Sequence, residues 1–372
     1  MQRNLPVAWV RDLLVHGDDL IAATQGRAIW ALDNVTPLRQ HARAASSKAP
    51  VLFEPAVAVR LRGSQNKDTP PPADTALGEN PPTGASIDYA LPHAAKKLTL
   101  TISDAAGKLV RAFASDAAPD APNAERYFAQ AWTQPPQRLS AAAGAHRFVW
   151  NLRAPRPGAA HYDYSIGAVF GVGVPIAPEG MLMPPGDYSV LLDADGQQAR
   201  TTLKVIADPR VALDAAALRD AFAFAAEVGQ ALQRNYIGVG EMSAVDEQIA
   251  AIESGKPAAD VAAAIEKFRG AEKPLAAGEG DASENLAAIG ELLAGLATDV
   301  EGSDRAPTQP QHGVLVASNE RLTRALARWD GVKHAQLAQL NAALQAAGKA
   351  PVAVPSADKI HLQRAPESKE LP

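Results

Sequence analysis

The chain has 372 residues, of which 47% are hydrophobic and only 5% aromatic, and its formal net charge is −5. This length allows two or three domains with real cores, and the negative balance argues against nucleic acid or an anionic membrane surface as a partner. Disulfides and thiolate chemistry are excluded because there is no cysteine. No apolar run reaches the ~20 residues of a membrane span. The sequence also predicts no signal peptide within this chain, and it leaves the compartment open.

Residues 1–40 contain short alternating segments separated by turns, and we expect strands at Val10–His16, Leu20–Thr24 and Ala28–Leu32. Three short strands cannot bury a core of their own, because sheets of this size are marginal unless another layer packs on them. The sequence therefore predicts an exposed sheet fragment. We expect it either to dock on the loops of the following β region or to drive self-association through residues 1–40.

The segment Leu98–Ser103 has the clearest pattern, since its apolar residues alternate with Thr and Ser as in a half-buried antiparallel strand. Further strands are expected at Ala56–Leu61, Ile87–Leu91, Leu109–Phe113, Gly144–Leu152, Asp187–Leu192 and Leu203–Ile206. In the first of these, the alternation groups Val57, Val59 and Leu61 on one side. We predict that residues 51–207 form an immunoglobulin-like antiparallel β-sandwich with long loops rich in Pro and Gly. Its predicted core contains Ile87, Leu100, Ile102, Phe148, Trp150, Tyr188 and Val190.

From Asp214, a good N-cap residue, the apolar period changes to that of a helix. The expected helical stripes are Leu218–Tyr236, Met242–Ile252, Val261–Phe268, Leu286–Leu296, Leu322–Trp329 and Leu337–Leu344. We predict an antiparallel helical bundle over residues 212–350, followed by a tail over 351–372 that is disordered at its end. Loops are expected at Gly270–Gly280 and Gly302–Gly313, and Asp281 and Glu284 have the spacing of a capping box.

The sequence shows no catalytic constellation, no cofactor motif and no metal-ligand spacing among its eight histidines. His16 lies beside Asp18 and Asp19, which favours a solvated turn over a cation site. His161, Tyr162, Asp163 and Tyr164 form the one cluster that could contact a ligand, because aromatic faces and carboxylates suit sugar binding. The alternative is a loop that is merely ordered against the sandwich. Glycoside hydrolysis needs a pair of carboxylates, and sequence alone cannot pair them.

Four segments resemble a known family. LLVHGDDLIAATQGRAIWALDNVTPLRQ (Leu13–Gln40) is similar to the closing blade of bacterial sortilin-like β-propeller proteins with BNR (neuraminidase) repeats, with Gln25 in place of a usual His and Asn34 in place of a usual Asp. GENPPTGASIDYAL, AGAHRFVWNLR and PPGDYSVLL resemble the segments that follow that propeller. These proteins are often labelled glycosyl hydrolase or exo-sialidase-like, and many are secreted or periplasmic.

The resemblance implies that a large propeller precedes these segments and that residues 1–40 are the remnant of its last blade. It assigns no catalytic residue, because the acidic residues of the related hydrolases lie on the propeller and no Asp-box occurs here. We therefore expect a non-catalytic scaffold or interaction region without cofactors, whose partner is the missing propeller part, a carbohydrate or a protein. The alternative is one part of a sialidase- or xyloglucanase-like glycosyl hydrolase whose catalytic propeller is mostly missing. A third interpretation is a truncated gene product without independent function.

Overall fold

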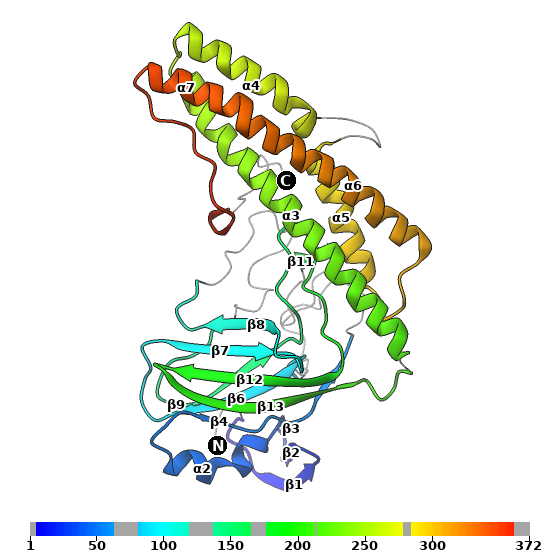
Figure 1. The fold of residues 1–372 in the computed structure, drawn as a ribbon. Coiled ribbons are helices and arrows are strands. Elements are labelled where there is room, and N and C mark those ends of the chain that lie inside the picture. Colours follow the sequence, from blue (N-terminus) through cyan, green and yellow to red (C-terminus); the bar gives the residue numbers. More distant parts are fainter. Residues whose placement is uncertain are drawn as a thin grey trace.

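The computed structural model of the chain describes residues 5–62, 81–118, 137–164, 176–212, 214–277 and 284–360. Strands come first in the chain and long helices follow, so the fold is mixed, β and then α, as the sequence predicts. The helices lie above the sheets in Figure 1, with α3 (Ala215–Ser254) and α6 (Gln309–Val332) side by side. Most of the long Pro/Gly-rich loops fall outside the described residues.

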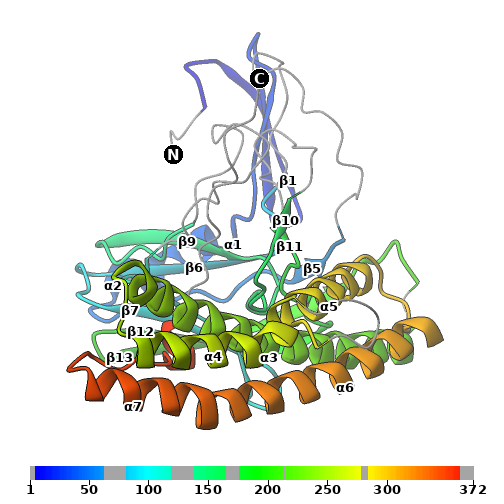
Figure 2. The same ribbon diagram turned by 90° about the horizontal axis from the view of Figure 1, so that it is seen from above.

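The N-terminal sheet contains β1 (Val10–His16), β2 (Asp19–Thr24) and β3 (Ile29–Leu32), paired antiparallel in that order. Two short helices, α1 (Thr36–Arg39) and α2 (His41–Ser46), follow it. In Figure 2, β1 rises away from the layer that contains β6 and β9. The attachment to that layer comes just after β3, where the Arg147 guanidinium donates to the carbonyls of Asp33 (3.0 Å) and Asn34 (2.8 Å).

Two further sheets share one hydrophobic core. The first has the order β5-β13-β12-β7-β8, with β5 (Ala58–Arg60), β7 (Leu98–Ser103), β8 (Leu109–Ala114), β12 (Gly186–Ala194) and β13 (Gln197–Ala207). The second has the order β4-β6-β9, with β4 (Val51–Leu52), β6 (Ala85–Leu91) and β9 (Gly144–Trp150). A separate short pair joins β10 (Asp163–Tyr164) to β11 (Ile176–Ala177). Each of the seven predicted core residues, from Ile87 to Val190, is at most 3% exposed, which confirms that part of the prediction.

Strand β5 differs from the expectation in two ways. It pairs parallel with β13, with Ala58 opposite Val205, so the β region is not entirely antiparallel. Val57 and Leu61 do share a side, but that side faces solvent, and the buried residues are Ala58 and Arg60. A period of two shows which residues alternate and not which face is buried. Arg60 can occupy an inward-facing position because a carboxylate from the helical region compensates its charge.

The helical region has fewer breaks than the sequence predicts. The first two stripes lie on the single helix α3, and the last two lie on α6, a π-helical turn η2 (Lys333–Leu337) and α7 (Ala338–Ala346), which run on without a loop. Glycines within α3 do not interrupt it, and two of them, Gly238 and Gly240, lie where side chains of other segments approach the helix closely. A Cβ on Gly240 would lie 2.1 Å from the Ile360 side chain. The loop predicted at Gly270–Gly280 is likewise wrong over its first part, since α4 (Ala259–Ala277) continues through Gly270.

The helix ends agree only in part with the predicted caps. Asp214 does cap α3, because its Oδ1 accepts from the Ala216 amide at 2.8 Å. The start of α5 (Leu286–Glu301) is capped by Asn285, not by the predicted capping box, and Asp281 lies outside the described residues. The loop expected to extend to Gly313 ends earlier, because Thr308 caps α6. Beyond α7, residues 351–360 fold back with a short 3₁₀ turn, η3 (Ala357–Lys359), and the rest of the tail is outside the described residues.

A buried ion-pair cluster joins the β part to the helices. Arg60, whose side chain is 2% exposed, donates through both Nη atoms to Asp304 in the loop between α5 and α6, at 2.5 and 2.7 Å. Arg62 Nε donates to the same carboxylate at 2.8 Å, and Arg153 Nη1 donates to Glu301 at 2.7 Å. Bidentate, charge-assisted hydrogen bonds of this kind hold two surfaces in one orientation. The cluster therefore fixes where the helices sit on the sheet.

Candidate functional site

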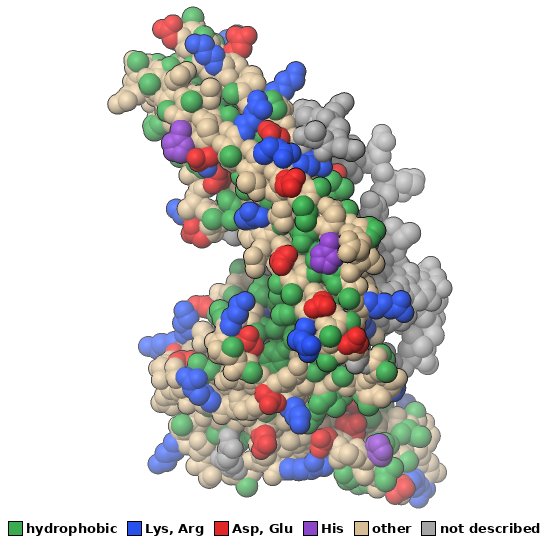
Figure 3. All heavy atoms as spheres, turned by 45° about the vertical axis from the view of Figure 1, so that its right-hand side comes forward, with side chains coloured by type: hydrophobic (Ala, Val, Ile, Leu, Met, Phe, Trp, Pro, Cys, Tyr) green, Lys and Arg blue, Asp and Glu red, His purple; other side chains and the backbone are tan. Residues whose placement is uncertain are grey.

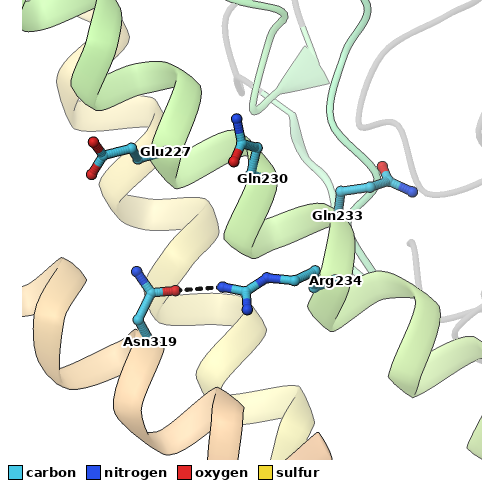
Figure 4. A pocket seen from close by; sticks show the side chains of 5 residues that line it. All are labelled: Glu227, Gln230, Gln233, Arg234 and Asn319. Atoms are coloured by element: carbon cyan, nitrogen blue, oxygen red, sulfur yellow. Dashed lines mark hydrogen bonds between the residues drawn. The ribbon is translucent and has the colours of Figure 1, made fainter.

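The first candidate is a polar groove between α3 and α6 (Figure 4). It has a volume of about 410 Å³ and is lined by Glu227, Gln230, Gln233 and Arg234 from α3 and by Asn319 from α6. Residues 227, 230 and 234 are three and four positions apart, so they project from one face of α3. Arg234 reaches across the groove and donates through Nη2 to Asn319 Oδ1 at 2.8 Å.

The groove can recognise a ligand through hydrogen bonds but carries no reacting pair. Its amides both donate and accept, and Arg234 only donates, a combination that suits polar, uncharged or weakly anionic groups. Glu227 is its only carboxylate among the described lining residues, whereas glycoside hydrolysis needs two carboxyl groups across the scissile bond. The geometry therefore supports binding rather than hydrolysis at this place.

The predicted ligand-contact loop lies next to this groove. The Gly158 amide donates to Gln233 Oε1 at 2.9 Å, and the Arg156 guanidinium lies 4.1 Å from the centre of the Tyr162 ring. Ala159 belongs to the core of the helical region, so the loop is ordered against α3. The alternative interpretation from the sequence, a loop ordered against the sandwich, named a different neighbour.

Only part of the four-residue cluster can be placed. The side chains of His161 and Tyr162 are half-buried, and the Tyr162 hydroxyl accepts from the Ala159 amide at 3.2 Å. Asp163 and Tyr164 form strand β10, and their side chains lie outside the described part of the structure. The cluster therefore stays a predicted contact site, now beside the groove rather than on the β region.

The second candidate is an apolar surface on the N-terminal sheet. Every residue of β1 is exposed, and Leu13, Leu14 and Val15 are each more than half exposed. Trp9, just before β1, is 72% exposed, and Ile29 at the start of β3 is 73% exposed. We call these five residues the β1 surface. Exposed apolar patches with this arrangement mark interaction sites on many proteins.

The edges of this sheet are open as well. In the strand pairing of the described residues, β2 lies between β1 and β3, and neither outer strand has a partner on its other side. Unpaired N–H and C=O groups along an edge strand are a template for another strand. The N-terminal sheet therefore offers both apolar side chains and backbone groups to a partner.

Two charged residues that the sequence analysis did not single out have buried side chains. Arg60 is one of them, and a lone arginine in an otherwise apolar strand was the available signal. The other is Glu272 on α4, whose side chain is 4% exposed and contacts Arg269 three residues earlier. Oppositely charged residues three positions apart are common on solvated helix faces, so the sequence did not predict that Glu272 is buried.

Among the described residues, no group of three His, Cys, Asp or Glu side chains is arranged to hold a metal ion. The acids beside His16 have structural partners: Asp18 pairs with Arg39 at 2.5 Å, and Asp19 accepts from the Asn34 amide at 2.9 Å.

No helix in the described ranges combines the length and apolar character that crossing a bilayer requires. On the face drawn in Figure 3, positive and negative side chains are interspersed over the described helices.

Comparison of the chain with protein-family models and with curated proteins finds no match.

Proposed function

We propose that this chain is a non-catalytic interaction region that presents its N-terminal sheet to a β-sheet of a partner protein. The observation that carries the proposal is the β1 surface, where a paired antiparallel sheet leaves one whole strand exposed. Successive residues of a strand point to opposite faces, so Leu13 and Val15 lie on one face and Leu14 on the other. A partner that covers both faces and extends the edge is itself a β-sheet structure.

The resemblance to sortilin-like BNR-repeat proteins supplies the kind of partner. In that interpretation the N-terminal sheet is the remnant of a propeller's last blade, and the missing part of the propeller covers it. The two sheets with a common core form the immunoglobulin-like sandwich, and the long helices form the antiparallel bundle. Arg147, which binds the carbonyls of Asp33 and Asn34, holds the blade remnant against the sandwich.

The test is complex formation with a propeller polypeptide. The chain is co-expressed with the product of the reading frame immediately upstream, and the mass of the purified species is measured by size-exclusion chromatography with light scattering. We expect a stoichiometric complex that Leu13→Lys combined with Val15→Lys abolishes. Leu109→Lys is the matched control, because Leu109 is an equally exposed apolar residue at the start of β8.

Three outcomes contradict this proposal. A monodisperse monomer that binds no propeller product would show that the β1 surface needs no cover. A complex that survives the double substitution in β1 but not the Leu109→Lys substitution would place the interface elsewhere. A homodimer that the double substitution dissociates would replace the propeller partner by a second copy of this chain.

The alternative function is a part of a glycosyl hydrolase, and the polar groove with its adjoining aromatic loop is the feature that favours it. Amide side chains beside an aromatic ring suit a carbohydrate, and the second carboxylate would come from another polypeptide. We expect no hydrolysis of aryl glycosides or sialosides by the chain alone. Turnover that persists through repurification and that a single Asp or Glu substitution removes would establish an enzyme.

A further inference from the structure

Glu272 is a buried acid with an incomplete set of partners. It lies on α4, and its Oε1 atom has no hydrogen-bond partner among the described residues. Its other oxygen, Oε2, accepts from Arg269 Nη1 at 3.2 Å. Burying an ionised carboxyl group with one oxygen unpaired is costly, whereas the neutral acid avoids most of that cost.

Arg269 collects more negative charge than it can neutralise. Its Nη1 atom also donates to Asp246 Oδ1 on α3, and its Nη2 atom lies 3.6 Å from Glu253 Oε2 on the same helix. With all three acids ionised, one positive charge would face three negative charges. Arg269 Nη1 donates to both Glu272 and Asp246, so the two carboxyl groups meet at one guanidinium nitrogen and can share a single proton. A shared proton halves the excess negative charge and supplies a hydrogen bond.

The surroundings favour that proton at near-neutral pH. Burial raises the pKa of Glu272 most, and the charge of Asp246 raises it further, while Arg269 lowers it in part; the result is a pKa of about 7. Helix α4 also packs against α5, α6, η2 and α7. The charged groups of that turn, Lys333 and His334, pair with Glu241 and Asp330 instead. The charged groups that shift the pKa of Glu272 are Asp246 on α3 and Arg269 on α4.

We propose that Asp246, Arg269 and Glu272 form a proton-responsive clasp between α3 and α4. One proton shared by the two carboxyl groups holds the two helices together at this point. When the proton passes to solvent, two negative charges remain uncompensated beside Arg269, and the contact between α3 and α4 loosens at this point. The clasp connects only α3 and α4, so the β region and its core stay unchanged.

The direction of the pH effect follows from linkage. The pKa of Glu272 in the folded chain, about 7, is above its ordinary value of 4.5, so the folded state binds the proton more tightly. The stabilisation is complete below 4.5 and is lost as the pH rises through about 7. Mild alkali, rather than acid, opens the clasp.

Two measurements test the clasp on the full chain. Carbon-detected NMR of ¹³C-labelled Glu carboxyl groups gives the titration midpoint of Glu272, assigned by the signal that Glu272→Gln removes; we expect about 7. Hydrogen exchange, corrected for the intrinsic rate, gives the protection of α4 amides on either side of that midpoint. We expect protection to fall about tenfold per pH unit above the midpoint, since one proton is released. In Glu272→Gln, which stays neutral, it should not change.

Glu266→Gln is the matched control, because Glu266 is an exposed acid on the same helix. It should keep the pH dependence of the unaltered chain. A Glu272 midpoint near the ordinary 4.5 would refute the clasp, and so would the absence of any Glu carboxyl signal with a midpoint near 7, which needs no folded Glu272→Gln. So would α4 protection that falls equally in the unaltered chain, Glu272→Gln and Glu266→Gln.

Discussion

At the scale of single residues, Trp150 shows how a predicted core position is realised. Its side chain is fully buried, its ring meets Tyr188 edge-on at 5.3 Å, and its Nε1 donates to the Arg153 carbonyl at 3.0 Å. The ring thus combines a large apolar contact with a satisfied polar group, the arrangement that buried tryptophans require. Arg153 in turn binds Glu301, so this part of the core is continuous with the contact to the helices.

Replacing Trp150 by alanine should lower the free energy of unfolding by about 3–5 kcal/mol, because it removes a fully buried ring and leaves a cavity. Urea denaturation followed by circular dichroism measures the change. Trp9→Ala is the control, since that ring is 72% exposed and its loss should change stability by less than about 0.5 kcal/mol. A cost below about 1 kcal/mol for Trp150→Ala would contradict the burial of this ring.

Asp304 is the residue on which the contact between the β part and the helices depends. Burial alone would raise its pKa, but hydrogen bonds from Arg60 and Arg62 outweigh burial and hold the pKa below its usual value. A lowered pKa means that the carboxylate stabilises the fold above its unfolded pKa, near 3.8. That stabilisation is lost as the pH falls through the lowered value.

Asp304→Asn should therefore be less stable than the unaltered chain at neutral pH, by about 3–5 kcal/mol, because the buried Arg60 and the half-buried Arg62 lose this counter-charge. The difference should shrink as the pH falls below 3.8, since the native aspartate then becomes neutral too. Denaturant melts over a pH series measure both quantities. Asp299→Asn, an exposed position on α5, should show neither effect, and a difference that stayed constant with pH would rule out this role for the charge.

At the scale of elements, the start of α6 shows how a local sequence defines a helix end. Thr308 Oγ1 accepts from the Gln311 amide at 3.4 Å, and Gln311 Oε1 accepts from the Thr308 amide at 2.8 Å. This reciprocal pair satisfies two amides that no carbonyl inside the helix can reach. The loop before α6 carries Asp304, so the cap and the buried ion pair hold the same connection.

Thr308→Ala should cost about 1 kcal/mol of stability, within the usual range of 0.5–2 kcal/mol for the loss of a cap. The measurement is the shift of the denaturation midpoint in urea at constant slope. Thr323→Ala tests whether any threonine of α6 has the same effect. Its hydroxyl only donates to the Asn319 carbonyl within the helix, and its loss should change stability by less than about 0.5 kcal/mol.

At the scale of the whole molecule, the first strand of the N-terminal sheet is far more exposed than the strands of the two sheets that share a core. β1 buries none of its residues, whereas Val35, just after β3, is buried, and Arg147 of β9 binds the carbonyls of the two residues before it. The attachment thus lies at residues 33–35 and not in the strands. A deletion that removes only the strands must therefore end before residue 33. The boundary expected from the sequence, at residue 40, would also remove the attachment.

Deleting residues 1–32 should leave the two sheets that share a core and the helices folded, because it retains Val35 and the two carbonyls that Arg147 binds. We expect an unchanged circular dichroism spectrum of the folded chain, less self-association in light scattering, and loss of binding to the propeller product. Unfolding of the two sheets that share a core in this variant would show that the N-terminal sheet is an integral layer of the β region.

The sequence alone determined what depends on neighbouring residues. The period of two predicted the strands from Leu98 to Leu192 and their core residues, and the period of 3.6 predicted the helical region and the Asp214 cap, because side-chain direction follows from local geometry. It also predicted the exposed N-terminal strands, since three short strands offer too little surface to bury.

Only the tertiary structure decided which partners distant residues find. Arg60 is buried because Asp304, 244 positions later, pairs with it, and the pKa of Glu272 is raised by burial between helices and by the charge of Asp246 on α3. The predicted loop at His161–Tyr164 was placed beside α3 by Gln233, a contact between segments far apart in the chain. Pairing across such separations depends on how sheets and helices stack, and no local pattern encodes it.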